Sequence, residues 1–355
     1  SRREFLGRSV AALAAASFLP SAFSCTGKSV AAPAPVDTAA EAGKVNSKFG
    51  GVQIGTITYS WRSMPGGLEN IIKYCQEANI SSIELMGGDL EAYLGAAENP
   101  MMKFFRRQAS QPAAKPGENP AAPRRMGPSK FTPEQQAEID KYKEEVKAWR
   151  LGLDLSKVEG ARKLLSDAGI SVHIVKMQPS GMGSDEEVDY AFKVAKAMGA
   201  KAVTDEINLE TAKRVAPFAE KHGMYMAFHN HMQYAEEGFS CDPILAISPS
   251  IMLNFDAGHF FGSTGIHPNE MIKKYHDRIY SIHLKDKTGP TTGDQPNTNQ
   301  VWGQGEMPLE DVLLLIKQEK WPIYCDIELE YDIKPWSDSV KEVGTCVKYA
   351  RQILM

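Results

Sequence analysis

The stretch Ile251-Met-Leu-Asn-Phe-Asp-Ala-Gly-His259 is a short apolar run that ends in a carboxylate and an imidazole. Short apolar runs of this length are typical of buried strands. Four further runs end in the same way, in histidine, lysine or acidic side chains: Ser171-Val-His-Ile-Val-Lys176, Met226-Ala-Phe-His-Asn-His231, Ser281-Ile-His-Leu-Lys-Asp286 and Ile327-Glu-Leu-Glu330. Imidazoles and carboxylates at several successive strand ends suggest one shared divalent metal site, so an enzyme is the first hypothesis.

Strand-like and helix-like segments alternate from residue 52 to the end of the sequence. The predicted strands are 52–58, 82–86, 170–177, 200–204, 224–230, 251–256, 279–285 and 322–329. The predicted helices are 68–78, 186–198, 209–222, 268–276, 309–318 and 336–353, with a long charged helix or helix pair at 131–166. Eight strands separated by helices predict an α/β fold, the closed parallel (β/α)8 TIM barrel. Its active site lies at the carboxyl ends of the strands, where the histidines are found.

Alternation along a strand decides which of these side chains share a face. His283 and Lys285 share one face, which we expect to be the barrel interior. The acids Asp326, Glu328 and Glu330 also share a face, and the residues between them are apolar, as suits the outer face beneath the helices. Spacing alone does not separate the roles of Glu328 and Glu330. His173 is explained equally well as a structural residue or as part of the site.

Charge buried at this density is costly unless it is paired or bound to metal. The candidate residues at the strand ends are Lys176, Glu206, His229, His231, Asp256, His283, Lys285, Glu328 and Glu330. Mixed oxygen and nitrogen ligands without thiolates favour Mn²⁺ and also admit Co²⁺, Zn²⁺, Mg²⁺ or Fe²⁺. Such an ion would polarise a substrate carbonyl, and a nearby side chain would remove the adjacent C–H proton.

The amino-terminal region is predicted to be separate from the barrel. Residues 1–25 match a twin-arginine export signal followed by a lipoprotein-like processing site, which would lipidate Cys25. Ordinary cleavage near Ala31 or Ala32, which would discard Cys25, is the alternative. Residues 26–48 are rich in Ala, Pro, Ser and Lys and predict a flexible linker, so the barrel would span 49–355. The protein is therefore expected to be exported to the periplasm, with membrane attachment only through Cys25. A Pro-rich insertion at about 95–132 follows the second strand on the catalytic side.

Composition narrows the classes of partner. The formal net charge is −4 and the pI about 6.1, which argues against a nucleic-acid partner. The five cysteines form no CxxC pair, so neither thiolate zinc nor a disulfide framework is expected. A small-molecule substrate is the expected partner, and a homo-oligomer is left open.

Five motifs in order resemble the sugar phosphate isomerase/epimerase family of xylose-isomerase-like barrels over about residues 50–355. They are His229-Asn-His231, Asn254-Phe-Asp-Ala-Gly-His259, Ile282-His-Leu-Lys-Asp286, Gly303-Gln-Gly-Glu306 and Ile327-Glu-Leu-Glu-Tyr331. The resemblance implies metal ligands at Asp256, His283 and Glu328. The strand-five glutamate of the epimerases is replaced here by His229, and Glu206 would supply the missing carboxylate, as in relatives similar to inosose dehydratases. His229 lies beside this set as a further ligand.

The resemblance implies a metal-dependent enzyme acting on keto-sugars or 3-keto-glycosides by proton abstraction next to a carbonyl. His231, Glu330, Lys285 or Lys176 would move the protons. Because phosphorylated sugars are cytoplasmic, an exported member of this family would act on unphosphorylated substrates. The alternatives are an isomerase or epimerase of free sugars, a phosphodiester-cleaving barrel, which the acidic pI disfavours, and a non-catalytic sugar-binding lipoprotein.

Overall fold

The computed structural model describes residues 45–101 and 131–355. The predicted signal, most of the predicted linker and the central part of the predicted insertion lie outside the described residues. Lys48, the last residue of the predicted linker, already belongs to the first strand, β1 (Lys48–Phe49). Among the helices in the described ranges, none has the length and apolar character needed to cross a bilayer.

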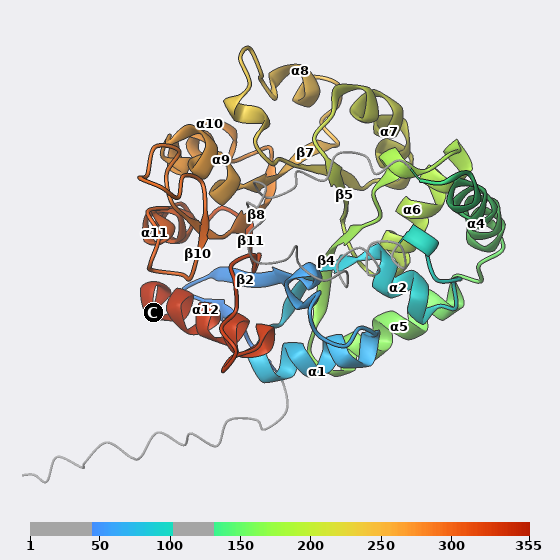
Figure 1. The fold of residues 1–355 in the computed structure, drawn as a ribbon, viewed down its shortest axis with the longest axis horizontal. Helices are drawn as coiled ribbons and strands as arrows, with labels where there is room; N and C mark the ends of the chain where they lie inside the picture. The colour runs from blue at the N-terminus through green and yellow to red at the C-terminus, as the bar shows by residue number, and fades with distance from the viewer. Residues whose placement is uncertain (1–44, 102–130) are drawn as a thin grey trace, which may run out of the picture. The chain divides into compact units, whose positions relative to one another are not determined.

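Parallel strands close into a barrel inside a ring of helices (Figure 1), which confirms the predicted (β/α)8 fold. The sheet closes because β2 pairs in parallel with both β11 and β3. The strands of the barrel are β2 (Val52–Ile57), β3 (Ser82–Met86), β4 (Ser171–Lys176), β5 (Ala202–Glu206), β6 (Tyr225–His229), β7 (Ile251–Asp256), β8 (Ile279–Leu284) and β11 (Tyr324–Ile327). A small antiparallel hairpin of β9 (Asp286–Lys287) and β10 (Asn299–Gln300) follows β8 directly.

The register of the strands sets polar residues side by side. Asp256 at the end of β7 is paired with His283 on β8, and His283 is paired with Asp326 on β11. On the next two strands, β6 and β5, Glu206 at the end of β5 is paired with His229 at the end of β6, which itself pairs with β7. β5 ends two residues later than predicted, because its pairing with β6 continues through Glu206 after the apolar part of the strand has ended.

The helices form the outer layer around the sheet (Figure 1). They are α1 (Leu68–Ala78), α2 (Gly87–Tyr93), α4 (Pro133–Leu151), α5 (Ser156–Asp167), α6 (Asp185–Ala197), α7 (Leu209–His222), α8 (Asp242–Leu245), α9 (Ala257–Thr264), α10 (Pro268–Tyr275), α11 (Leu309–Glu319) and α12 (Ser339–Leu354). The charged segment 131–166 forms the predicted helix pair. The last helix begins at Ser339 rather than at Trp336, because the Asp338 side chain caps the backbone N–H groups of Val340 and Lys341.

Two layers of packing hold the barrel together. The larger core lies between the sheet and the helices and contains Cys325, Ile327 and Leu329, as strand alternation predicts. A smaller cluster includes Ile174, Met252 and Tyr280 from the alternate face of their strands. Tyr324 packs against that smaller cluster, which therefore fills the interior of the barrel.

The helix that follows the predicted insertion is held by a buried ion cluster. The Arg150 guanidinium on α4 donates to both oxygens of Glu91 on α2, at 2.8 and 3.0 Å, and to Glu187 on α6 at 3.0 Å. The three side chains are 15, 9 and 5% exposed, and Tyr190 donates a further hydrogen bond to Glu91. Arg150 therefore joins three helices of the outer layer at one point.

Candidate active site

Four buried side chains from adjacent strand ends form the centre of the site. They are His229 at the end of β6, Asp256 at the end of β7, His283 on β8 and Glu328 just after β11. One nitrogen or oxygen atom from each lies within 4.8 Å of the corresponding atoms of the other three. We refer to these four residues as the central group. Sequence reasoning placed all four among the metal ligands.

Short contacts connect the members of the central group. His283 Nδ1 lies 2.7 Å from Glu328 Oε2, and His229 Nε2 lies 3.2 Å from Asp256 Oδ2. The remaining oxygen of Asp256 accepts a 2.6 Å hydrogen bond from the backbone N–H of His259, so Asp256 also caps helix α9. The strand end and the helix start therefore fix the Asp256 carboxylate from both sides.

Lys285 is held in the centre of the carboxylates. Its Nζ lies 2.9 Å from Asp256 Oδ2, 2.8 Å from Glu328 Oε2 and 2.7 Å from Glu330 Oε2. Burial opposes the charge of Lys285, but these carboxylates raise its pKa above the usual value. Sequence reasoning assigned Lys285 to proton transfer. In the structure, Lys285 is a cation that holds three carboxylates in position.

A second group lies at the outer side of His229. Glu206 Oε2 lies 3.2 Å from His229 Nδ1 and 3.3 Å from His231 Nδ1, while its other oxygen accepts a 3.0 Å hydrogen bond from Lys176. The side chain of His231 is 50% exposed and that of Glu206 34% exposed. The structure therefore places Glu206, His231 and Lys176 beside the central group, with His231 facing solvent.

Glu84 on β3 supports the central group from inside the barrel. Its Oε2 lies 2.9 Å from His283 Nε2 and accepts a 2.8 Å hydrogen bond from Asn254. Both Glu84 and Asn254 are fully buried. When the Nε2–H of His283 donates a hydrogen bond to Glu84, Nδ1 is the nitrogen whose lone pair can face the central group. Glu84 therefore fixes the tautomer and the orientation of the ring.

His173 belongs to a separate interior pair. Its Nε2 lies 2.8 Å from Asp326 Oδ2, its Nδ1 lies 2.8 Å from Ser82 Oγ, and its ring stacks on Tyr324 at 4.1 Å. Of the two explanations left open for His173, its partners favour the structural one. The Asp326 side chain contacts His173 and is not part of the central group, although Asp326 shares a strand face with Glu328.

The surrounding carboxylates raise the pKa of the two histidines in the central group, His229 and His283. Burial would lower the pKa of His229, but hydrogen bonds with Asp256, Glu206 and Glu328 raise it to about 9. Burial likewise opposes the charge of His283, yet Glu84 and Glu328 raise its pKa well above the usual value. Carboxylates outnumber ammonium groups around these rings, so the cluster attracts positive charge.

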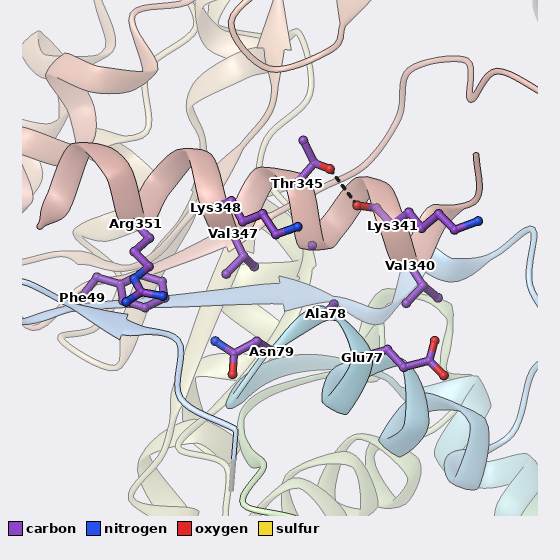
Figure 2. Close-up of a pocket in the computed structure, with 11 residues that line it drawn as sticks. Phe49, Glu77, Ala78, Asn79, Val340, Lys341, Thr345, Val347, Lys348 and Arg351 are labelled. Carbon is purple, nitrogen blue, oxygen red and sulfur yellow. Dashed lines mark hydrogen bonds between the residues drawn. The ribbon is translucent and has the colours of Figure 1, made fainter. Parts of the chain in front are cut away.

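Two cavities among the described residues lie outside the central group. A cavity of about 620 Å³ lies between α1 and α12 (Figure 2). Its lining combines apolar residues with Lys341, Lys348 and Arg351, and contains no histidine and a single carboxylate, Glu77. A smaller cavity of about 270 Å³ is lined by Arg62, Tyr331, Asp332 and Glu330. Because Glu330 contacts Lys285, this smaller cavity borders the candidate site.

Comparison with known proteins gives the family. The sequence model of the xylose isomerase-like TIM barrel family matches residues 140–348. The chain belongs to this family. Among curated relatives, inosose dehydratases from Clostridium botulinum and Clostridium perfringens are 28% and 26% identical over 137 and 141 residues. These matches cover 34% and 35% of this chain but 45% and 46% of the relatives, so the chain spans about half the length of the curated relatives it matches.

Two solved structures are similar to this chain in fold. The probable 3-DHS dehydratase AsbF from Bacillus anthracis superposes with a TM-score of 0.53 at 11% identity, covering 84% of this chain and 98% of the other. The IOLI protein with a bound zinc atom superposes with a TM-score of 0.51 at 12% identity, covering 85% and 98%. At these identities the likeness concerns the fold alone.

The central group fits a divalent cation. Two imidazoles and two carboxylates converge in a buried position, and this is the donor set expected for a first-row divalent ion. Protons on His229 and His283 supply the positive charge that an ion would replace. The residues that would hold it in this xylose isomerase-like barrel are Asp256, His283, Glu328 and His229, with Glu206 adjacent to His229.

Replacing Glu84 by glutamine is expected to weaken divalent metal binding by about 10- to 100-fold, because Glu84 fixes His283 without touching the metal itself. The shape of the side chain is retained, so the thermal unfolding temperature should change little. Chelator competition with Mn²⁺ or Zn²⁺ measures the affinity. Glu77→Gln, at a side chain that is 52% exposed on α1, is the matched control and should bind metal like the parent protein. Unchanged affinity in Glu84→Gln would show that Glu84 has no supporting role.

Sequence reasoning missed Glu84, gave Asn254 no role of its own, and did not single out Lys287, a largely buried residue of β9. A signal for Glu84 was present, because it is the one charged residue within an otherwise apolar strand, Ser82–Met86. Its partner, His283, is 199 residues away in the sequence, so the contact between the two side chains becomes visible only once the barrel is closed. Lys287 lies beyond the end of β8, where alternation along that strand no longer places side chains.

Proposed function

We propose that this protein is a divalent-metal-dependent enzyme that removes a proton next to the carbonyl of a keto-sugar or 3-keto-glycoside. The observation that carries the proposal is the buried central group at the carboxyl ends of the barrel strands, with half-exposed His231 beside it. This combination offers an electrophilic centre and an accessible proton acceptor in the position where barrel enzymes hold their substrates.

Asp256, His283, Glu328 and His229 would hold the metal, with Glu206 completing the set. When bound, a divalent cation supplies Lewis acidity that stabilises negative charge on a carbonyl oxygen. Mn²⁺ is the metal that we favour, and zinc in the IOLI structure supports a first-row ion.

The side chains of the chain itself would move the protons. His231 reaches solvent and is oriented by Glu206, so its ring can take a proton from a bound sugar. Glu330 lies at the border of the 270 Å³ cavity and is positioned by Lys285, so it is a second candidate for proton transfer on another side of the substrate. Lys176, paired with Glu206, can donate a hydrogen bond to a developing oxyanion.

For a 3-keto-glycoside, the reaction is a β-elimination. The base takes the C2 proton, the electron pair forms the C1–C2 double bond, and the C1–O bond breaks. A general acid returns a proton to the departing aglycone oxygen. The curated relatives are named dehydratases, which eliminate water, and this favours an elimination over an isomerisation.

We further propose that the enzyme works outside the cytoplasm. The twin-arginine pattern and Cys25 at the amino terminus support export and lipid attachment. Export of a sugar-acting enzyme favours unphosphorylated substrates. Isomerisation or epimerisation of a free keto-sugar is the second candidate, because the same proton abstraction next to a carbonyl starts both reactions.

Product analysis of the Mn²⁺-loaded protein distinguishes these reactions. We expect aglycone release from a panel of 3-keto-glucosides, and a fall of about 10²- to 10⁴-fold in kcat for His231→Ala, the range for loss of a general base. His267→Ala is the control, because His267 caps the start of α10 and contacts Asp311 rather than the central group, so its loss should leave kcat unchanged. Conversion of free ketoses without aglycone release would favour the isomerase. Metal binding without turnover of either class would favour a sugar-binding protein.

A further inference from the structure

Lys287 is a largely buried lysine whose ammonium forms no ion pair with any of the described residues. The residue is 3% exposed, yet no hydrogen bond or ion pair engages its ammonium anywhere in residues 45–101 and 131–355. Lys285, two residues earlier, contacts three carboxylates. Buried lysines are normally paired, because an isolated ammonium away from water is costly. The difference between these two lysines needs an explanation.

Helix α9 is shaped to admit both lysines. A Cβ at Gly258 would collide with Lys285 Cγ, and a Cβ at Gly262 would lie 2.7 Å from Lys287 Cε. The two glycines are one helical turn apart and therefore lie on the same face of α9. The absence of a side chain at Gly262 thus lets the Lys287 stem pack closely against α9.

Unpartnered polar atoms surround Lys287. Asn299 is its cross-strand partner in the β9–β10 hairpin, and Asn299 Oδ1 is buried without a hydrogen bond. Asn297 Oδ1, which faces Gly262 beside the Lys287 stem, is likewise buried and unpartnered. His259 Nδ1, one turn before Gly262, is the third such atom. We call these four residues the Lys287 subsite.

The Lys287 subsite lies close to the central group. Burial lowers the pKa of Lys287, and the charge of Lys285 lowers it further, while Asp256, Glu330 and Glu328 act in the opposite direction. His259 also lies near both groups, because its Nε2 is 3.8 Å from Asp256 and 3.6 Å from Glu330. A ligand that reached from the central group to Lys287 would therefore pass His259.

We infer that the Lys287 subsite binds a carboxylate of a polyhydroxylated substrate, so the enzyme prefers sugar acids, such as uronic acids or their glycosides, over neutral sugars. The ammonium of Lys287 would pair with the carboxylate, and the amide oxygens of Asn297 and Asn299 would accept hydrogen bonds from neighbouring hydroxyls. A phosphate fits less well, because its oxygens require several donors and this subsite offers one cation among acceptors. The inference rests on the proposed function for the location of the reacting end.

Calorimetry on the metal-loaded protein tests the inference with D-glucuronate and D-glucose, which differ only in the carboxylate at C6. We expect the parent protein to bind glucuronate about 10- to 100-fold more tightly, the range for a hydrogen bond to a charged group. Lys287→Met should abolish this preference, and Lys287→Arg should retain part of it. Lys348→Met, at an exposed lysine on α12 (Figure 2), is the matched control and should keep the full preference.

Three results would overturn the inference. They are equal binding of the two sugars by the parent protein, a preference that survives in Lys287→Met because the carboxylate binds only at the metal, and tighter binding of glucose 6-phosphate than of glucuronate. Thermal unfolding provides an independent readout, since Lys287→Met removes an unpaired charge and should not lower the unfolding temperature. A lower unfolding temperature would point to a structural role. Calorimetry measures binding without turnover. Absence of aglycone release would therefore contradict the proposed reaction, but it would not contradict a preference for glucuronate.

Discussion

Asp256→Asn and His283→Ala are each expected to lower divalent metal affinity by more than about 100-fold. This loss is larger than the effect expected for a residue that only supports a metal ligand. Turnover should fall with metal content. Asp256→Asn keeps the shape of the side chain and removes the charge that His229 and Lys285 contact. His283→Ala removes the ring that connects Glu84 to Glu328. Metal analysis after dialysis, together with kcat, measures both effects.

The fold should survive these changes, because Lys285 keeps Glu328 and Glu330 when Asp256 is neutralised. The matched control for His283→Ala is His276→Ala, since His276 lies just after α10 and stacks on Trp321 away from the site. It should retain metal and activity. Full metal retention in a well-folded Asp256→Asn or His283→Ala protein would contradict the assignment of the central group.

Arg150→Met is expected to cost about 3–5 kcal/mol of stability, because it leaves Glu91 and Glu187 buried without their cation. The methionine fills part of the space, so the loss of stability comes mainly from the two buried carboxylates that no longer have a cation. The urea midpoint of unfolding, followed by circular dichroism, measures the change.

Lys163→Met provides the contrast for Arg150→Met. Lys163 forms an ion pair with Asp167 at 2.6 Å, comparable in length, but the two side chains are 74 and 61% exposed. Removing an exposed pair should cost less than about 1 kcal/mol. If both variants shifted the urea midpoint equally, burial would not be what makes the Arg150 cluster important.

Sequence patterns predicted the barrel well because each strand carries its own local signal. The run Ile251–Asp256 is apolar, ends in an acid and was located to the residue. The prediction that the last helix begins at Trp336 was wrong, because Asp338 caps a helix that begins at Ser339. Trp336 is apolar but 80% exposed, so it does not belong to the buried face of that helix. Local periodicity identifies a helix more reliably than its first residue.

The site was predictable only as far as strand ends were recognised. His229, Asp256, His283 and Glu328 come together because parallel strands present their carboxyl ends at one rim. The pairing of Glu84 with His283 depends on closure of the barrel. That Lys287 has no ion-pair partner among the described residues depends on how the folded chain places its carboxylates. Neither property has a local sequence pattern.

Anomalous diffraction from crystals of the Mn²⁺- or Zn²⁺-loaded protein would locate the bound metal. We expect one strong peak in contact with Asp256, His283 and Glu328 at the carboxyl ends of β7, β8 and β11. A peak located elsewhere, or metal-soaked crystals without a peak among these three side chains, would contradict it.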